Sequence, residues 1–277
     1  MKPLAPALTD RPALDRQRDR AVRNGSDAFF LHDLAIDEIK ERLAMVNRSF
    51  TRAAIVTGHP SIWSDVVPGA KVVADTDVLD LAPSSFDLVI HAMSLHWAED
   101  PVGQIVQCQR ALNPDGLFLA CLFGGQTLNE LRTALAEAEI ATRGGLSPRI
   151  LPMAEIRDLG GLLQRAGLNL PVADSISQTV TYGDVVRLMH DLRNMGEGNA
   201  LASRARTGLS KELLSRTHGL YAEHFTADDG RLKVTFEIIF LSGWSPHPDQ
   251  QKPMRPGSAS HSLASVLAVH FEWVSPF

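Results

Sequence analysis

Four short apolar segments recur between residues 52 and 123, and their spacing constrains the fold more than any other feature of the sequence. They read RAAIVTG (52–58), AKVVAD (70–75), FDLVIHAM (86–93) and LFLACLF (117–123). Each has the length and apolar content of a buried strand. A helix beginning at Asp100-Pro101, a favourable capping pair, separates the third from the fourth. Alternating strands and helices predict an α/β fold, a doubly wound, mostly parallel sheet with helices on both faces.

The chain divides into three regions by composition and periodicity. Residues 1–48 predict an N-terminal helical segment, and residues 49–244 predict the α/β domain, including a helical cap at about 176–226. The strongest late strand is RLKVTFEIIFLSGW (231–244). Residues 245–277 contain several prolines and little periodicity, which predicts a loop-rich extension.

Composition excludes several classes of protein. The 277 residues carry a net charge of −5 with both signs interspersed, so no nucleic-acid partner is expected. The apolar runs are strand-sized, which predicts no transmembrane segment. Cys108 and Cys121 lie in apolar segments and are expected to be buried free thiols. With no secretory signal pattern, a cytoplasmic location is expected.

The loop after the first strand contains a single glycine, Gly58, followed by HPSIW. Loops that cradle a nucleotide-type cofactor need several glycines, because the backbone must turn sharply and approach the ligand closely. This segment therefore stands where a cofactor loop is expected but lacks the composition of one.

Over about residues 15 to 260 the sequence resembles the class I methyltransferases of the type 11 group. The resemblance rests on SFDLV, SLHW and ALNPDGLFL in that order and spacing. SPRILPMAEIRDLGGLLQRAGL, DLRNMGEGNA, TFEIIFLSGWSPH and QQKPMRPGSA are similar to the branch that includes a mitochondrial complex I assembly factor, with the biotin-pathway malonyl-carrier methyltransferases as more distant relatives.

That resemblance implies a seven-stranded sheet with its last strand antiparallel, and S-adenosylmethionine bound over the carboxyl ends of the first strands. In the assembly-factor branch it implies maturation of respiratory complex I, with hydroxylation of an arginine in a partner subunit.

The family's first motif is an acidic residue followed by G-x-G-x-G, and this chain matches it at Gly58 alone. The acidic position falls on Val56, and the second and third glycines fall on Pro60 and Ile62. Only 14 residues separate Val56 from Lys71, too few for the usual helix, strand and second helix. One early strand-helix unit is therefore expected to be missing, and cofactor binding is expected to be weak or absent.

Asp75 leaves two alternatives open. If AKVVAD occupies the second strand's place in the family sheet, Asp75 could hold the ribose hydroxyls of the cofactor, since it follows Gly58 by about the expected distance. Otherwise Asp75 caps the end of a strand and faces solvent.

Ser94, His96 and Trp97 belong to SLHW, at the carboxyl end of the central strand where open α/β sheets place ligands. The resemblance implies that they border the cofactor. His96 is the candidate catalytic residue, as a base or hydrogen-bond partner. The alternative is that His96 and Trp97 only pack this loop against the following helix.

Other kinds of site find little support. His91 and His96, and His218 and His224, do not have a metal-ligand spacing, so no metal site is expected. A serine-hydrolase triad and a nicotinamide-binding glycine fingerprint are also not expected.

Four basic residues could line a pocket for an anionic substrate or a partner segment: Arg187, Arg193, Lys252 and Arg255. The alternative is a solvated basic face.

Two functions are consistent with these observations. The first is an S-adenosylmethionine-dependent enzyme that modifies a protein partner, a subunit of a respiratory complex. The second is a catalytically inactive protein of the methyltransferase fold that acts as a binding or assembly factor.

Overall fold

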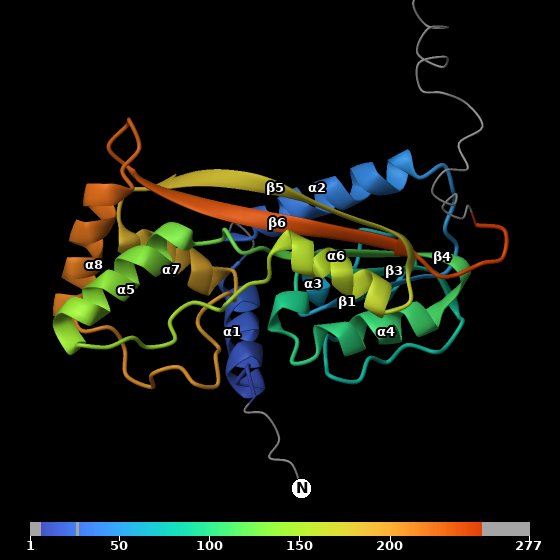
Figure 1. The fold of residues 1–277 in the computed structure, drawn as a ribbon, viewed down its shortest axis with the longest axis horizontal. Helices are drawn as coiled ribbons and strands as arrows, with labels where there is room; N and C mark the ends of the chain where they lie inside the picture. Colours follow the sequence, from blue (N-terminus) through green and yellow to red (C-terminus); the bar gives the residue numbers. More distant parts are fainter. Residues whose placement is uncertain (1–6, 26–27, 251–277) are drawn as a thin grey trace, which may run out of the picture. The chain divides into compact units, whose positions relative to one another are not determined.

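Six strands form one sheet in the computed structural model, which describes residues 7–25 and 28–250 (Figure 1). They are β1 (Ala53–Thr57), β2 (Lys71–Val73), β3 (Phe86–Ala92), β4 (Leu112–Phe123), β5 (Asn169–Tyr182) and β6 (Leu232–Trp244). Their order across the sheet is β2-β1-β3-β4-β6-β5. β1 pairs in parallel with β2 and β3, and β3 with β4, whereas β6 is antiparallel to both its neighbours. The expected α/β fold with an antiparallel last strand is confirmed.

The described part of the chain has one strand fewer than the seven that the resemblance implies. Only the four-residue helix α3 (Pro60–Trp63) lies between β1 and β2. β2 pairs directly with β1, on the side away from β3. AKVVAD therefore takes the second strand's place, which is the first of the two alternatives for this segment.

Helices cover both faces of the sheet (Figure 1). Their bounds are α1 (Arg11–Asn24), α2 (Phe30–Met45), the short 3₁₀ helix η2 (Leu95–Trp97), α4 (Pro101–Ala111), α5 (Asn129–Arg143), α6 (Ile156–Arg165), α7 (Val185–Asn194) and α8 (Lys211–His224). α2 shares one buried cluster with α5, α7 and α8, and α4 shares another with α6.

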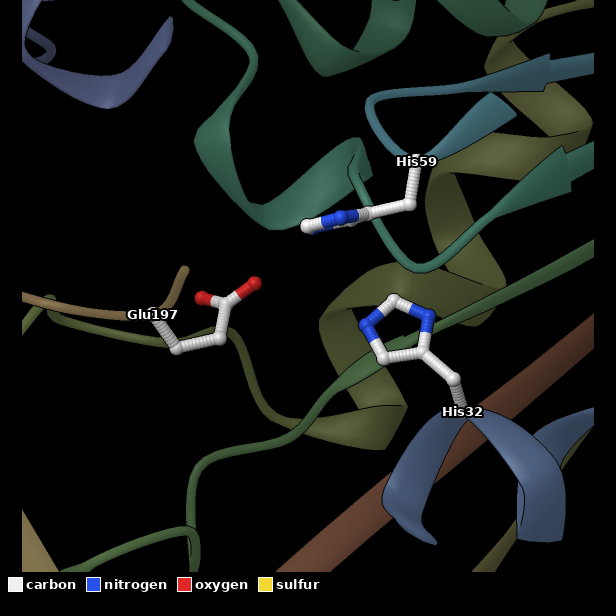
Figure 2. Close-up of side chains that lie close together, drawn as sticks. All are labelled: His32, His59 and Glu197. Carbon is white, nitrogen blue, oxygen red and sulfur yellow. The ribbon is translucent and has the colours of Figure 1, made fainter. Parts of the chain in front are cut away.

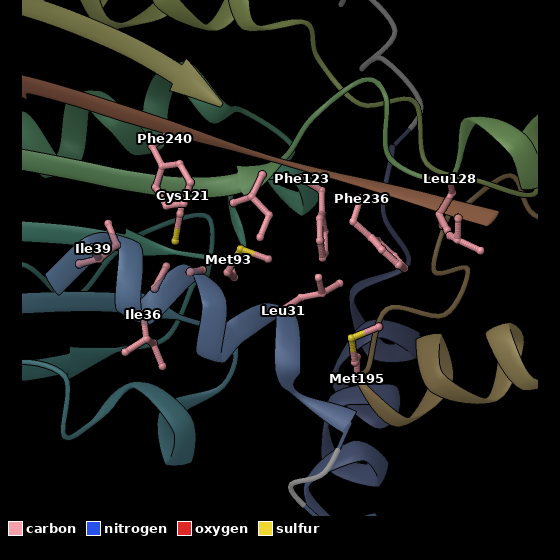
Figure 3. Packing of buried hydrophobic residues seen from close by; sticks show 14 of the residues in the cluster. Leu31, Ile36, Ile39, Met93, Cys121, Phe123, Leu128, Met195, Phe236 and Phe240 are labelled. Carbon is pink, nitrogen blue, oxygen red and sulfur yellow. The ribbon is translucent and has the colours of Figure 1, made fainter. Parts of the chain in front are cut away.

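The two clusters follow from strand periodicity, because successive side chains of a strand point to opposite faces. Within β4, Cys121 joins the α2 cluster and Phe118 joins the α4 cluster. Figure 3 shows the α2 side, where Leu31, Ile36 and Ile39 belong to the same cluster as Cys121. Both cysteines of the chain are buried and free, as the sequence predicts.

The segment NPDG (113–116) lies inside β4 as an irregularity. Leu112 and Leu117 pair with residues only two positions apart on β3, so the segment between them bulges out. Asp115 takes φ +62°, a left-handed conformation that aspartate tolerates better than most residues.

The amino-terminal segment reaches the carboxyl ends of the first two strands. Asp10 caps α1 by accepting a hydrogen bond from the backbone N–H of Ala13 at 3.1 Å. α1 contacts α7, and Thr9 forms a β-bridge with Leu201. These contacts hold α1 in the orientation in which its face with Arg11 and Arg18 lies toward the ends of β1 and β2.

Residues up to Pro246 form one compact unit. The boundaries expected at residues 48 and 244 stay predictions. Among the residues that the structure describes, no helix is long and apolar enough to cross a membrane. Residues 251–277, most of the expected extension, lie outside the described part.

Candidate functional site

The guanidinium group of Arg18 lies directly over the loop that follows β1. A Cβ atom built on Gly58 would lie only 2.2 Å from Cζ of Arg18. A side chain at position 58 would therefore collide with the arginine. The glycine is needed here because an arginine of α1 approaches the backbone closely.

Arg18 forms a buried ion pair with Asp75, just beyond the end of β2. Its Nη1 donates to both carboxylate oxygens, at 3.0 and 2.9 Å, and only 4% and 3% of the two side chains are exposed. Arg11 adds a second contact, Nη2 to Oδ1 at 2.7 Å. Burial favours the neutral acid, but the two arginines outweigh it and lower the pKa of Asp75. The alternative that Asp75 faces solvent is wrong.

A second buried network joins His96 and Trp97 to Glu197. Trp97 Nε1 donates to Glu197 Oε2 at 2.8 Å, and His96 Nε2 lies 3.3 Å from the same oxygen. Burial alone would raise the pKa of Glu197, but His96, Arg18 and the Trp97 hydrogen bond lower it to about 2. His96 therefore does more than pack a loop, since it contacts a buried carboxylate.

Glu197 reaches this position because Gly196 takes φ +80° after the end of α7. A Cβ on Gly196 would lie 3.2 Å from His59 Cε1 and 3.2 Å from Arg18 Cα. The glycine thus lets the chain turn close against α1 and the β1 loop.

His32 and His59 complete the buried group on the side of α2 and the β1 loop. Their ring centroids are 4.8 Å apart, and Trp63 Nε1 donates to His32 Nδ1 at 3.0 Å. Ligand atoms of His32, His59 and Glu197 lie within 4.8 Å of one another (Figure 2). Burial is the main cause that lowers the pKa of His59 to about 4, and the charge of Arg18 is the second. Burial is also the main cause that holds the pKa of His32 well below its usual 6.5, and the neighbouring His59 is the second. We call His32, His59 and Glu197 the histidine–glutamate cluster.

A cavity of about 400 Å³ lies beside Trp97 and Glu197. Phe123, Leu131 and Phe236 contribute to its apolar wall. Five arginines also line it: Arg20, Arg149, Arg193, Arg204 and Arg206. The cavity therefore combines an apolar wall, a positively charged lining and one buried carboxylate.

Three of those arginines already have carboxylate partners. Arg149 pairs with Glu139, and Arg204 and Arg206 both pair with Asp10. Arg20 and Arg193 have no carboxylate partner among the described residues. Those two charges remain available to an anionic ligand.

The structure brings together five of the residues predicted from the sequence. These five residues lie at the carboxyl ends of β1, β2 and β3. They are Gly58, Asp75, Ser94, His96 and Trp97. The buried hydroxyl of Ser94 has no hydrogen-bond partner among the described residues.

Of the two basic residues that the structure describes, Arg193 lines the cavity and Arg187 does not. Arg187 faces a separate hollow beside Tyr182, pairs with Asp184, and has a 77% exposed side chain. Lys252 and Arg255 lie outside the described residues. The sequence alone did not separate Arg187 from Arg193, although the six positions between them on a helix place them on different faces.

Sequence reasoning missed four residues of the site: Arg18, His32, His59 and Glu197. In the sequence, His59 is one residue of the loop after the first strand, and that loop is unusual only in having a single glycine. Glu197 lies in DLRNMGEGNA, a segment that carries part of the family resemblance. Its sequence neighbours give no sign that its side chain is buried. His32 and His59 are 27 positions apart in the sequence, a spacing that matches no metal-binding motif, so the sequence does not mark them as a pair.

Comparison with known proteins gives three kinds of relative. Residues 35–120 match a family described as "Methyltransferase domain". The arginine-hydroxylase NDUFAF5, mitochondrial, of Danio rerio is 37% identical, over 73% of this chain and 63% of that protein. Its counterpart in Homo sapiens is 37% identical, over 72% and 58%. A malonyl-[acyl-carrier protein] O-methyltransferase of Methylovorus sp. (strain MP688) is 34% identical, over 91% and 97%.

The chain thus spans about three fifths of the length of the first two relatives and nearly all of the third. The matched residues 35–120 contain Gly58, Asp75 and the SLHW segment. Arg18 and Glu197 lie outside that range.

Proposed function

Because the chain belongs to the methyltransferase-domain family, we propose that it is a member that holds a segment of a respiratory-complex subunit during assembly, without binding S-adenosylmethionine over its first strand loop. The observation that carries this proposal is the Arg18 guanidinium over Gly58, ion-paired to Asp75. The assembly role rests on the resemblance to the complex I assembly-factor branch, and the NDUFAF5 relatives are named as arginine-hydroxylases. The proposal keeps the cytoplasmic location expected from the sequence.

The residues present do not fit S-adenosylmethionine in the position usual for the family. The cofactor must approach the loop backbone closely, and the arginine takes that space at Gly58. Its ribose hydroxyls need a carboxylate acceptor, and the Asp75 oxygens already accept from Arg18 and Arg11. Opening a buried ion pair leaves an uncompensated charge, at a cost of about 3–5 kcal/mol. That cost would weaken cofactor binding by at least about a hundredfold.

The cavity beside Glu197 supports binding of a protein segment. Its apolar wall suits a large aliphatic or aromatic side chain, and Arg20 and Arg193 suit acidic residues next to it. We therefore expect an acidic segment with an apolar anchor.

Titration calorimetry with S-adenosylmethionine and its demethylated product tests the cofactor part. We expect no binding heat for the wild-type protein up to millimolar ligand. The Arg18→Ala variant, which empties the space over Gly58, should bind more tightly than the wild type. Low-micromolar binding by the wild type would overturn the proposal.

Binding to purified subunits of respiratory complex I tests the partner part. Arg193→Glu should weaken the binding at least about tenfold, because a cavity-lining cation becomes an anion facing acidic residues. Arg187→Glu is the matched control, since Arg187 lies on the same helix but faces another hollow. Equal effects of the two substitutions would contradict the cavity as the binding site.

A modifying enzyme is the second candidate function, favoured by the contact between His96 and Glu197 beside the cavity. A histidine held against a carboxylate can accept a proton from a substrate group bound there. Coexpressing the partner subunit with the wild type or with His96→Ala, followed by intact-mass measurement, tests this function. An added methyl group or oxygen atom that depends on His96 would favour the enzyme over the holding role.

A further inference from the structure

Four nitrogen and oxygen atoms of the histidine–glutamate cluster are buried and have no hydrogen-bond partner among the described residues. They are His32 Nε2, His59 Nδ1, His59 Nε2 and Glu197 Oε1. Buried polar atoms of folded proteins nearly always have a partner. So many unpartnered atoms from three separate elements indicate that this site takes something that the protein chain itself does not supply.

From these residues we infer that His32, His59 and Glu197 bind one divalent transition-metal ion. Two imidazoles and a carboxylate are ligands that zinc and iron(II) accept. An ion holds such atoms at about 2.0–2.2 Å, so ligand atoms of one ion lie roughly 3–4 Å apart. The three ligand atoms here already lie within 4.8 Å of one another. Side-chain movement of about 1 Å closes the site.

The contacts around Glu197 orient it for this role. Its Oε2 is engaged by Trp97 Nε1 at 2.8 Å and by His96 Nε2 at 3.3 Å. The other oxygen, Oε1, has no partner among the described residues, and Figure 2 shows both histidine rings on one side of the carboxylate group. Partners that fix a carboxylate in this way are typical of the surroundings of metal ligands.

The surroundings of the two histidines suit a bound ion. The side chains of His32 and His59 are fully buried, so an ion held between them would be shielded from bulk water. The negative charge of Glu197 partly offsets that of the ion. The nearby charge of Arg18 opposes the ion, but Arg18 is itself paired with Asp75.

Trp63 sets a limit on binding. Because its Nε1–H donates to His32 Nδ1, the metal-free ring carries its proton on Nε2. An ion on His32 requires that proton on the other nitrogen, so the Trp63 hydrogen bond is lost when the ion binds. Removing the Trp63 donor should therefore tighten binding, which a purely structural role of the cluster does not predict.

An ion could reach the cluster from the cavity, because Glu197 lines both. Only three protein ligands are present in the cluster, so an ion held there keeps at least one coordination position for water or another ligand. The expectation from the sequence that no metal binds is replaced by this proposal, which does not depend on the proposed function.

Zinc and cobalt(II) titrations of the full-length protein, stripped with chelator and free of any histidine tag, test the site. We expect one zinc ion per chain in calorimetry, and visible absorption bands when cobalt fills the same site. Glu197→Gln and His59→Gln, which nearly preserve side-chain size, should each weaken zinc binding about a hundredfold. His218→Ala, an exposed histidine on α8, is the control and should bind like the wild type.

Two further measurements keep the test decisive if a variant folds poorly. Zinc should raise the melting temperature of the wild type, because it binds the folded state only. Trp63→Phe should bind zinc about tenfold more tightly, since no buried hydrogen bond is then lost on binding. Absence of saturable binding by the wild type, or zinc binding unchanged in both Glu197→Gln and His59→Gln, would overturn the proposal and leave a water-filled chamber.

Discussion

The carboxyl ends of the first two strands and of the next two are built in opposite ways. Beyond β1 and β2, Arg18 and Asp75 close the space with a buried ion pair. Beyond β3 and β4, Trp97 and Phe123 border a cavity of about 400 Å³. The first half of this sheet edge is filled by the protein's own side chains, and the second half borders an open cavity. The proposal that the protein holds a partner segment rests on this difference.

The largest effect on stability is expected at the ion pair between Arg18 and Asp75. Asp75→Asn leaves Arg18 buried without a counter-charge, which should destabilise the protein by about 4 kcal/mol. Urea unfolding measures this change. The double variant Arg18→Met/Asp75→Leu removes both charges and should regain most of the loss. A loss below about 1 kcal/mol for Asp75→Asn would show that the ion pair does not close this region.

A pH series separates the ion pair from the histidines. His91 lies on β3, fully buried, and burial lowers its pKa to about 4, against the hydrogen bond with Gln104. The unfolded chain takes up a proton at this residue below pH 6.5, whereas the folded chain does not until about pH 4. The unfolding free energy should therefore fall as pH falls through that window, by about 3 kcal/mol from His91.

The ion pair contributes little to that slope above about pH 5, because an unfolded aspartate, with a pKa near 3.8, takes up a proton only at lower pH, and the pKa of Asp75 in the folded protein is lower still. His91→Leu should reduce the slope between pH 6.5 and 4 by about one proton. An unchanged slope in this variant, measured by urea unfolding at each pH, would show that His91 does not titrate as described.

A smaller effect is expected at Gly58. Gly58→Ala places a methyl group against the Arg18 guanidinium, which should destabilise the protein by about 1–2 kcal/mol. Gly145→Ala is the control, because nothing lies within 4 Å of its Cβ position. Thermal unfolding compares the two. If Gly58→Ala is as stable as its control, the arginine does not hold the position over the loop.

The smallest effect is expected at Arg187, which belongs to neither half. Its side chain is 77% exposed and pairs with Asp184 at 3.5 Å. Arg187→Ala should change the unfolding free energy by less than about 0.5 kcal/mol. A clearly larger loss in urea unfolding would place Arg187 in a contact beyond that surface pair.

The sequence by itself determined most of the strands and the start of one helix, because apolar periodicity and caps act over a few residues. β1, β3, β4 and β6 stand where their apolar runs predict them, and α4 begins at the predicted Asp100-Pro101 start. The short link from β1 to β2 also followed from the count of residues alone. Local chemistry sufficed for these features.

Only the tertiary structure decided what fills the site. Arg18 and Asp75 are 57 positions apart, and His96 and Glu197 are 101 apart. No spacing rule links such pairs, since their contact depends on how α1 and the loop after α7 pack onto the strand ends. His32, His59 and Glu197 come from three separate elements for the same reason. Residue types limit which chemistry is possible, and the packing of distant segments selects which of it the protein can use.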